Sequence, residues 1–188
     1  RILERLAGAA PIPELRGETL IRAARTLHAE QARHDEAVEL LTKASELVPF
    51  DAAARDLFRD AATAAEKWIR LASVLRTFAL AEETPQTRDA LVVEIAEVLR
   101  AKAGEPDRAL GWLSEQFAAR PVPGPVFDAL AADLREREKW STLTEAYKTI
   151  AAKNDDPDTR WFGLRGAADV AERHVERPDV AFDVLANV

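Results

Sequence analysis

The feature that most constrains how this chain folds is an internal repeat. Prolines at Pro13, Pro85 and Pro157 lie 72 residues apart (85 − 13 = 157 − 85 = 72), and each is followed three positions later by an arginine. The same register continues without gaps through two further columns, which are Ala24, Ala96 and Ala168, then Asp35, Asp107 and Asp179. A fixed period of several tens of residues is typical of chains that stack one supersecondary unit on the next.

Within each unit the apolar residues recur every three or four positions. Leu20, Ala24 and Leu27 form the first such stripe, which is the pattern of an amphipathic helix with one buried face. Three further stripes follow before the unit ends, containing Ala37, Phe58 and Trp68 in turn. The composition agrees, since 47% of residues are hydrophobic, 31% are charged and only 7 are glycine. We therefore expect an all-α fold.

Four helices per unit form two hairpins of about 36 residues each, close to the period of helix-turn-helix solenoids. Thr84 and Asp156 each precede a proline, which is typical of an N-cap residue followed by Pro at the first helical position. We expect a single array over 1–188 with about ten helices. Its units are predicted at 13–84 and 85–156, with partial units at 1–12 and 157–188.

The second helix of the unit resembles that of the tetratricopeptide repeat (TPR) family. In that family the helix carries Ala, a large apolar residue, a second Ala and a closing Pro, and Ala37, Leu41, Ala44 and Pro49 reproduce both the residues and their spacing. The next unit repeats the pattern with Gln116 in place of the second alanine. The other hairpins differ more from the family and carry Trp68 and Trp140 in register, which resembles the divergent half-a-TPR arrays.

The resemblance implies an α-solenoid of antiparallel hairpins, wound as a right-handed superhelix, that serves as a non-catalytic protein-protein interaction scaffold. In that geometry the first helix of a hairpin lines a concave face that binds a peptide or protein segment. The mixed charge expected there suits such a partner. The predicted groove residues are Arg25, His28, Val93, Glu97, Arg100, Arg165, Asp169 and Glu172, with Trp161 as an aromatic that the other units lack.

Three other functions compete with peptide binding. The array could be a structural spacer or an oligomerisation arm that self-associates through its open ends. It could bind RNA, as helical repeats of the pentatricopeptide kind do with a similar period. It could be a helical enzyme, in which case a closed apolar pocket should hold converging titratable groups. We rank the spacer directly after the scaffold.

The charge of the chain argues against nucleic acid as the partner. Its formal net charge is −7 and its isoelectric point is near 5.1, whereas phosphate binding needs clustered Lys and Arg. No apolar run approaches the roughly 20 residues of a membrane span, so we expect no membrane insertion. The partner we expect is another protein.

The source and the cellular location are constrained only by composition. The many alanines and arginines indicate a bacterial protein, and we expect a cytoplasmic location while leaving the periplasm open. The chain has no methionine and its first and last stripes stop partway through a unit. We therefore expect a fragment of a larger protein.

Few residues offer catalytic or metal-binding chemistry. His28 and His34, with Glu30 close in sequence, form the only conceivable metal pair, and solvated histidines explain them as well. Glu94 and Glu97 are three positions apart on one predicted helix and could act as acid and base, but carboxylates at this spacing are common on ordinary helices. We therefore expect no enzyme activity, no cofactor and no metal. The two in-register tryptophans are expected to be packing anchors between hairpins.

Overall fold

The computed structural model describes residues 12–174 of the chain. Within this range the chain forms nine α-helices and one π-helical turn, joined by turns and without strands. The all-α prediction is therefore confirmed. The helices predicted for residues 1–11 and 175–188, including the column position Asp179, lie outside the described residues.

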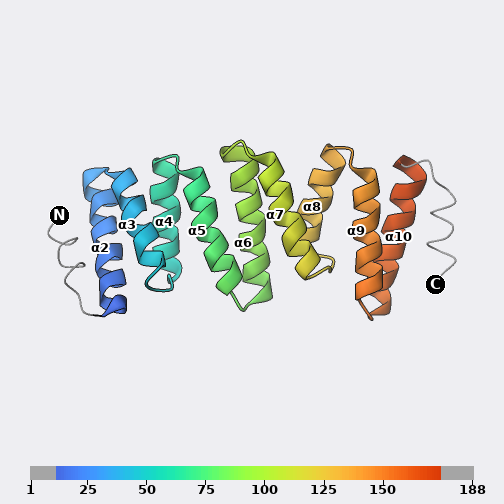
Figure 1. The fold of residues 1–188 in the computed structure, drawn as a ribbon, viewed down its shortest axis with the longest axis horizontal. Helices are drawn as coiled ribbons and strands as arrows, with labels where there is room; N and C mark the ends of the chain where they lie inside the picture. Colours follow the sequence, from blue (N-terminus) through green and yellow to red (C-terminus); the bar gives the residue numbers. More distant parts are fainter. Residues whose placement is uncertain (1–11, 175–188) are drawn as a thin grey trace. The chain divides into compact units, whose positions relative to one another are not determined.

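The chain divides into two compact parts that meet between Glu105 and Pro106. This boundary falls inside the unit predicted at 85–156. The first part contains α2 (Pro13–Gln31), α3 (His34–Ser45), α4 (Ala52–Ala64), α5 (Trp68–Ala81) and α6 (Pro85–Glu97), which continues as the π-helical turn η1 (Val98–Lys102). The second part contains α7 (Pro106–Ala119), α8 (Pro125–Glu136), α9 (Trp140–Lys153) and α10 (Pro157–His174). Within each part every helix packs on the next one along the chain (Figure 1).

The helices begin where the sequence pattern predicts. Pro13 and Pro85 occupy the first turn of α2 and α6, and Pro157 begins α10. The carboxylate of Asp156 accepts a hydrogen bond of 2.8 Å from the backbone of Thr159, as an N-cap should, and the hydrogen bonds from Thr159 lower the pKa of Asp156. Thr84 is different, because it stands at the N-cap position without a side-chain cap.

The turns between helices repeat with the sequence period. Four turn residues adopt a left-handed backbone with φ between 51° and 68°, namely Ala32, Glu66, Gly104 and Glu138. Ala32 and Gly104 are equivalent in the repeat, as are Glu66 and Glu138. A left-handed conformation disfavours any side chain by about 1–2 kcal/mol, yet three of the four are not glycine. The packing of the flanking helices must therefore hold these turns in place.

The backbone hydrogen bonds that close these turns also recur in register. The amide of Arg33 donates to the carbonyl of Leu27, and that of Glu105 donates to Leu99. The two hairpins of the other kind close with a shorter loop, in which Lys67 donates to Ala62 and Lys139 donates to Leu134. Two turn types therefore alternate along the chain, and each binds the carbonyl groups that a helix end leaves free.

Small residues let neighbouring helices approach closely. Ala24, Ala37 and Ala44 are fully buried between α2 and its neighbours. In the second part a Cβ atom on Gly163 would lie 2.7 Å from the carbonyl oxygen of Tyr147 and 2.7 Å from the amide nitrogen of Ala151. The backbones of α9 and α10 therefore touch at this glycine, and no side chain fits between them.

A buried carboxylate in the second part depends on one arginine. Asp133 is 3% exposed, and its Oδ1 accepts a hydrogen bond of 3.3 Å from Nε of Arg137. The same guanidinium donates to Asp107 at 2.5 Å, which lowers the pKa of Asp107. In the preceding repeat the equivalents of Asp133 and Arg137 are Ala61 and Ala65. The second part thus places an ion pair where the first part has alanines.

This ion pair gives a direct test of the packing. Arg137→Ala leaves Asp133 buried without its counter-charge and should lower the free energy of unfolding by about 3 kcal/mol. Adding Asp133→Ala copies the alanines of the preceding repeat and should restore most of that loss. Urea denaturation followed by circular dichroism measures both, with the exposed Arg108→Ala as the control. If Arg137→Ala behaves like Arg108→Ala, the buried carboxylate does not depend on Arg137.

Candidate functional site

The first part contains a hollow of about 670 Å³ at the start of α5. Its walls come from three places in the chain that the fold brings together. They are Val38 and Glu39 of α3, the segment from Glu66 to Ser73, and Lys102 and Ala103 at the end of η1. The hollow therefore draws on three successive hairpins, and no single helix could form it.

The turn before α5 sets the direction of the side chains at the mouth of the hollow. Glu66 has a left-handed backbone, and its amide donates to the carbonyl of Thr63. Lys67 takes the N-cap position without a side-chain cap, and Trp68 is the first helical residue. Basic and aromatic side chains therefore follow each other directly at the point where the chain enters α5.

Trp68 contacts the end of the first helix of the next repeat. The ammonium nitrogen of Lys102 lies 5.9 Å from the centre of the Trp68 ring, within the range of a cation–π contact. In the second part the equivalent Trp140 is stacked on His174, with ring centres 3.8 Å apart and planes 9° apart. Lys102 and His174 are themselves 72 residues apart. Both tryptophans are half-buried, so each is a contact between hairpins and also offers part of its surface to solvent.

The charged side chains of the hollow have partners at its rim. Lys67 donates to Asp35 at 2.9 Å, and this hydrogen bond raises the pKa of Lys67. Arg70 lies 3.8 Å from Glu39. Both carboxylates remain more than half exposed, and ion pairs of this kind contribute only about 0–1 kcal/mol. A binding partner could therefore replace either carboxylate at little energetic cost.

The groove residues predicted from the sequence lie on three helices. In the first part α2 packs against α3 and α4, whereas α6 packs against α5, so the contacts place Arg25 and Glu97 in different helix pairs. His28 and Val93 are half-buried, and the others are exposed. Helix α2 carries Arg25 and His28. Helix α6 and η1 carry Val93, Glu97 and Arg100, and α10 carries Trp161, Arg165, Asp169 and Glu172.

Several of these residues have local partners. His28 contacts His34 across the turn that follows α2, and Asp169 forms an ion pair of 2.8 Å with Arg173 one turn further along α10. Trp161 is 50% exposed. The neighbouring Phe162 instead packs edge-on against Phe127. Both aromatics at the start of α10 are exposed in part, Trp161 more than Phe162, which is 39% exposed.

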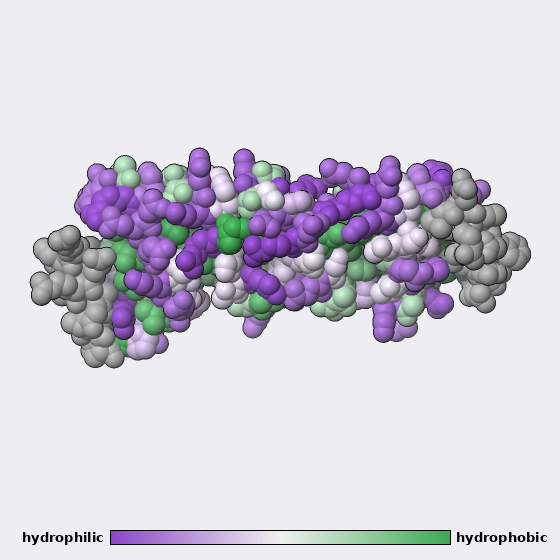
Figure 2. All heavy atoms as spheres, turned by 45° about the horizontal axis from the view of Figure 1, so that its top comes forward, coloured by the Kyte–Doolittle hydropathy of each residue, from purple (hydrophilic) through white to green (hydrophobic). Residues whose placement is uncertain are grey.

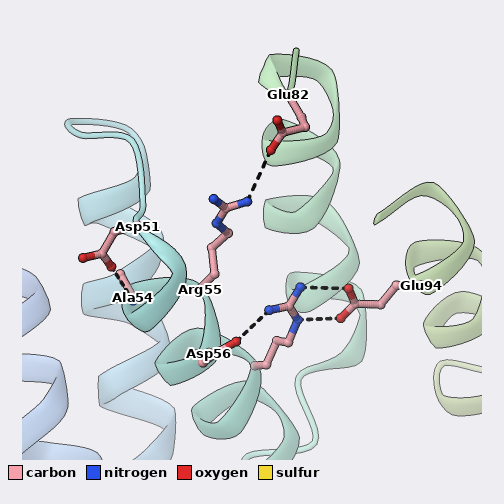
Figure 3. A network of polar contacts seen from close by, with 7 residues as sticks. Asp51, Ala54, Arg55, Asp56, Glu82 and Glu94 are labelled. Atoms are coloured by element: carbon pink, nitrogen blue, oxygen red, sulfur yellow. Dashed lines mark hydrogen bonds and ion pairs between the residues drawn. The ribbon is translucent and has the colours of Figure 1, made fainter. Parts of the chain in front are cut away.

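In the candidate acid–base pair of Glu94 and Glu97, Glu94 instead forms an ion pair with a residue of another helix. Both carboxylate oxygens of Glu94 accept hydrogen bonds from Arg59 of α4, at 2.6 Å and 2.9 Å. Figure 3 shows Glu94 facing α4, where Arg59 also reaches Asp56. Glu97 is exposed and takes no part. This arrangement ties α6 to α4 and leaves Glu94 occupied, so it gives no support to general acid–base chemistry at this position.

The same region holds two further contacts that order α4. The carboxylate of Asp51 caps the helix by accepting from the amide of Ala54 at 2.7 Å. Arg55 reaches Glu82 at the end of α5, with 3.6 Å between the charged atoms (Figure 3). Arg55 and Arg59 thus connect α4 to α5 and α6, the two helices that follow it.

Sequence reasoning did not predict the hollow. The signal was present, because Lys102 and His174 share a register position just as Trp68 and Trp140 do. Without the structure, nothing indicates that the end of one helix reaches the start of another. The π-helical turn η1, which ends at Lys102, was not predicted either.

One face of the described residues is mostly polar. On the face drawn in Figure 2, hydrophilic side chains cover most of the surface and hydrophobic ones appear in small separated groups. Among the described residues, no helix is both long enough and apolar enough to cross a bilayer, and no three His, Asp or Glu side chains are grouped as metal ligands. The chain matches no family model, no curated protein and no solved structure.

The ion pair between α4 and α6 can be measured by a double-mutant cycle. Arg59 and Glu94 are each only about one-third exposed and form a two-pronged contact, so we expect a coupling of about 1 kcal/mol between Arg59→Ala and Glu94→Ala. The exposed pair of Lys148 and Glu145 serves as the comparison and should couple by less than about 0.5 kcal/mol. Equal coupling in the two cycles would show that the Arg59 contact does not hold the helices together.

Proposed function

We propose that this chain is a non-catalytic protein-binding scaffold of the TPR-like kind, and that the hollow beside Trp68 is its main contact with a peptide or protein segment. The observation that carries the proposal is the composition of this hollow. It combines the half-buried ring of Trp68 and the exposed side chain of Ile69, 41% accessible, with three cationic groups. Apolar centres bordered by charged groups are typical of surfaces that bind proteins.

The chemistry of the hollow points to a partner segment that carries carboxylates next to an apolar or aromatic residue. Lys102 faces the Trp68 ring rather than a carboxylate, and Lys67 and Arg70 have only solvated partners. A carboxylate arriving from a partner can therefore form a charge-assisted hydrogen bond. The apolar residue beside it can cover Ile69.

The net negative charge of the whole chain does not prevent a segment with carboxylates from binding in the hollow. Its net charge is −7, but charges on the surface are screened beyond about 8 Å at physiological ionic strength. A partner seated in the hollow meets the three cations Lys67, Arg70 and Lys102 together with the two carboxylates of Glu39 and Glu66, which leaves a balance of one positive charge. The local charge therefore decides which segment binds there.

Two features of the fold support a repeat scaffold as the frame of this site. Each helix packs on the next within its part, and the turns recur with the period of the sequence, as stacked hairpins require. The π-helical turn that ends at Lys102 separately supports a functional site at this position, because such turns are rare and often occur at functional sites.

Peptide display against the immobilised 188-residue protein tests the proposal. We expect enrichment of short segments with Asp or Glu beside an apolar or aromatic residue. A synthetic peptide from this set should bind at least about tenfold more weakly to the variant Arg70→Glu/Lys102→Glu, which is about 1.4 kcal/mol. Fluorescence anisotropy at low and physiological salt measures the affinity.

A matched variant identifies the surface that binds. Arg25→Glu/Arg165→Glu reverses the same number of charges on the groove predicted from the sequence, and we expect it to retain the affinity. Loss of binding in this variant alone would move the site to that groove. Enrichment of no peptide at all would contradict the scaffold and favour the structural spacer. Circular dichroism confirms beforehand that both variants remain helical.

A further inference from the structure

Two histidines meet at the turn between α2 and α3. Nδ1 of His28 lies 2.9 Å from Nδ1 of His34, and the ring centres are 4.7 Å apart with the planes inclined by 60°. Both residues are half-buried. The sequence shows only that they are six positions apart across a helix break, so their contact is a product of the fold.

The backbone of the turn fixes this arrangement. Ala32 has a left-handed backbone at the end of α2, and the amide of Arg33 donates to the carbonyl of Leu27 at 3.0 Å. His34 is the first residue of α3, and His28 lies in the last turn of α2. The positions of both rings are thus set by a closed turn between two packed helices.

The distance between the two nitrogens is compatible with one class of ion. Imidazole nitrogens bind divalent metals at about 2.0–2.1 Å. Two nitrogens at right angles around such an ion are then about 2.9 Å apart, whereas tetrahedral ligands are about 3.4 Å apart. The observed 2.9 Å therefore matches neighbouring positions of a square-planar or octahedral ion, the geometry that Cu(II) and Ni(II) prefer.

The protonation of the pair allows such an ion to enter. At 2.9 Å the two rings share a hydrogen bond, in which one Nδ1 donates and the other accepts. An ion needs both Nδ1 lone pairs, so the donor ring must move its proton to Nε2. This is a change of tautomer with no change of charge on either ring.

We propose that His28 and His34 chelate one divalent ion of the copper and nickel class through their Nδ1 atoms. Water fills the other coordination positions, because no third His, Asp or Glu joins the pair among the described residues. This site is separate from the hollow beside Trp68, and its failure would leave the proposed function unchanged. It replaces the expectation from sequence that the chain has no metal site.

Titration of the 188-residue protein with Cu(II), followed by calorimetry and electron paramagnetic resonance, tests the site. We expect one equivalent bound, with hyperfine splitting from two imidazole nitrogens. His28→Gln and His34→Gln should each weaken binding at least about tenfold, because a chelate becomes a single ligand. His174→Gln changes the remaining histidine and should leave the affinity unchanged.

A second readout does not depend on any variant. In ¹⁵N spectra of the histidine rings, a diamagnetic square-planar ion such as Pd(II) at saturation should move both His28 and His34 to the Nε2–H tautomer. The proposal is overturned if wild-type protein binds no Cu(II), if His28→Gln and His34→Gln retain wild-type affinity, or if His174→Gln loses as much as they do. It is also overturned if the ring tautomers stay unchanged while the ion binds.

Discussion

The close approach of neighbouring helices through alanine and glycine is the contact on which the rest of the structure depends. Ala24 and Ala37 are fully buried at the α2 to α3 contact, and Gly163 brings the backbone of α10 against α9. At such separations even one added methyl group must displace something. This tight packing constrains the turns, because a closely packed hairpin allows few loop conformations. Non-glycine residues therefore keep a left-handed backbone in these turns, although that conformation is intrinsically unfavourable for them.

The two candidate sites both arise from these constrained turns. The turn at Ala32 brings His28 against His34, and the turn at Glu66 places Trp68 where the end of the first helix of the next repeat reaches it. The repeats differ in the side chains that occupy equivalent places. Lys102 leaves room for a hollow beside Trp68, whereas His174 is stacked flat on Trp140. Equivalent backbone positions thus hold different side chains and present different surfaces, and repeat proteins in general acquire separate binding sites in this way.

The sequence predicted the helices well because their signals are local. The prolines at 13, 85 and 157 and the apolar stripes mark where helices begin and which faces are buried. The candidate sites could be predicted only in part, because they depend on distances between residues far apart in sequence. The pairing of Glu94 with Arg59 replaces the suspected pairing with Glu97, and the hollow at Trp68 needs a side chain from a helix that begins 17 residues later, at Pro85. Periodicity identifies equivalent positions, but it does not tell which of them touch.

The repeat imposes the same turn geometry on hairpins that lie 72 residues apart. The most direct measurement is the backbone φ of Ala32, Glu66 and Glu138 in the 188-residue protein, from three-bond couplings and chemical shifts in solution. We expect a positive φ at all three, near the values of 51°, 52° and 54° in the structure. A negative φ at Glu66 or Glu138 while the flanking helices remain intact would contradict this expectation, because equivalent turns would then differ and the repeat would not determine how the hairpins close.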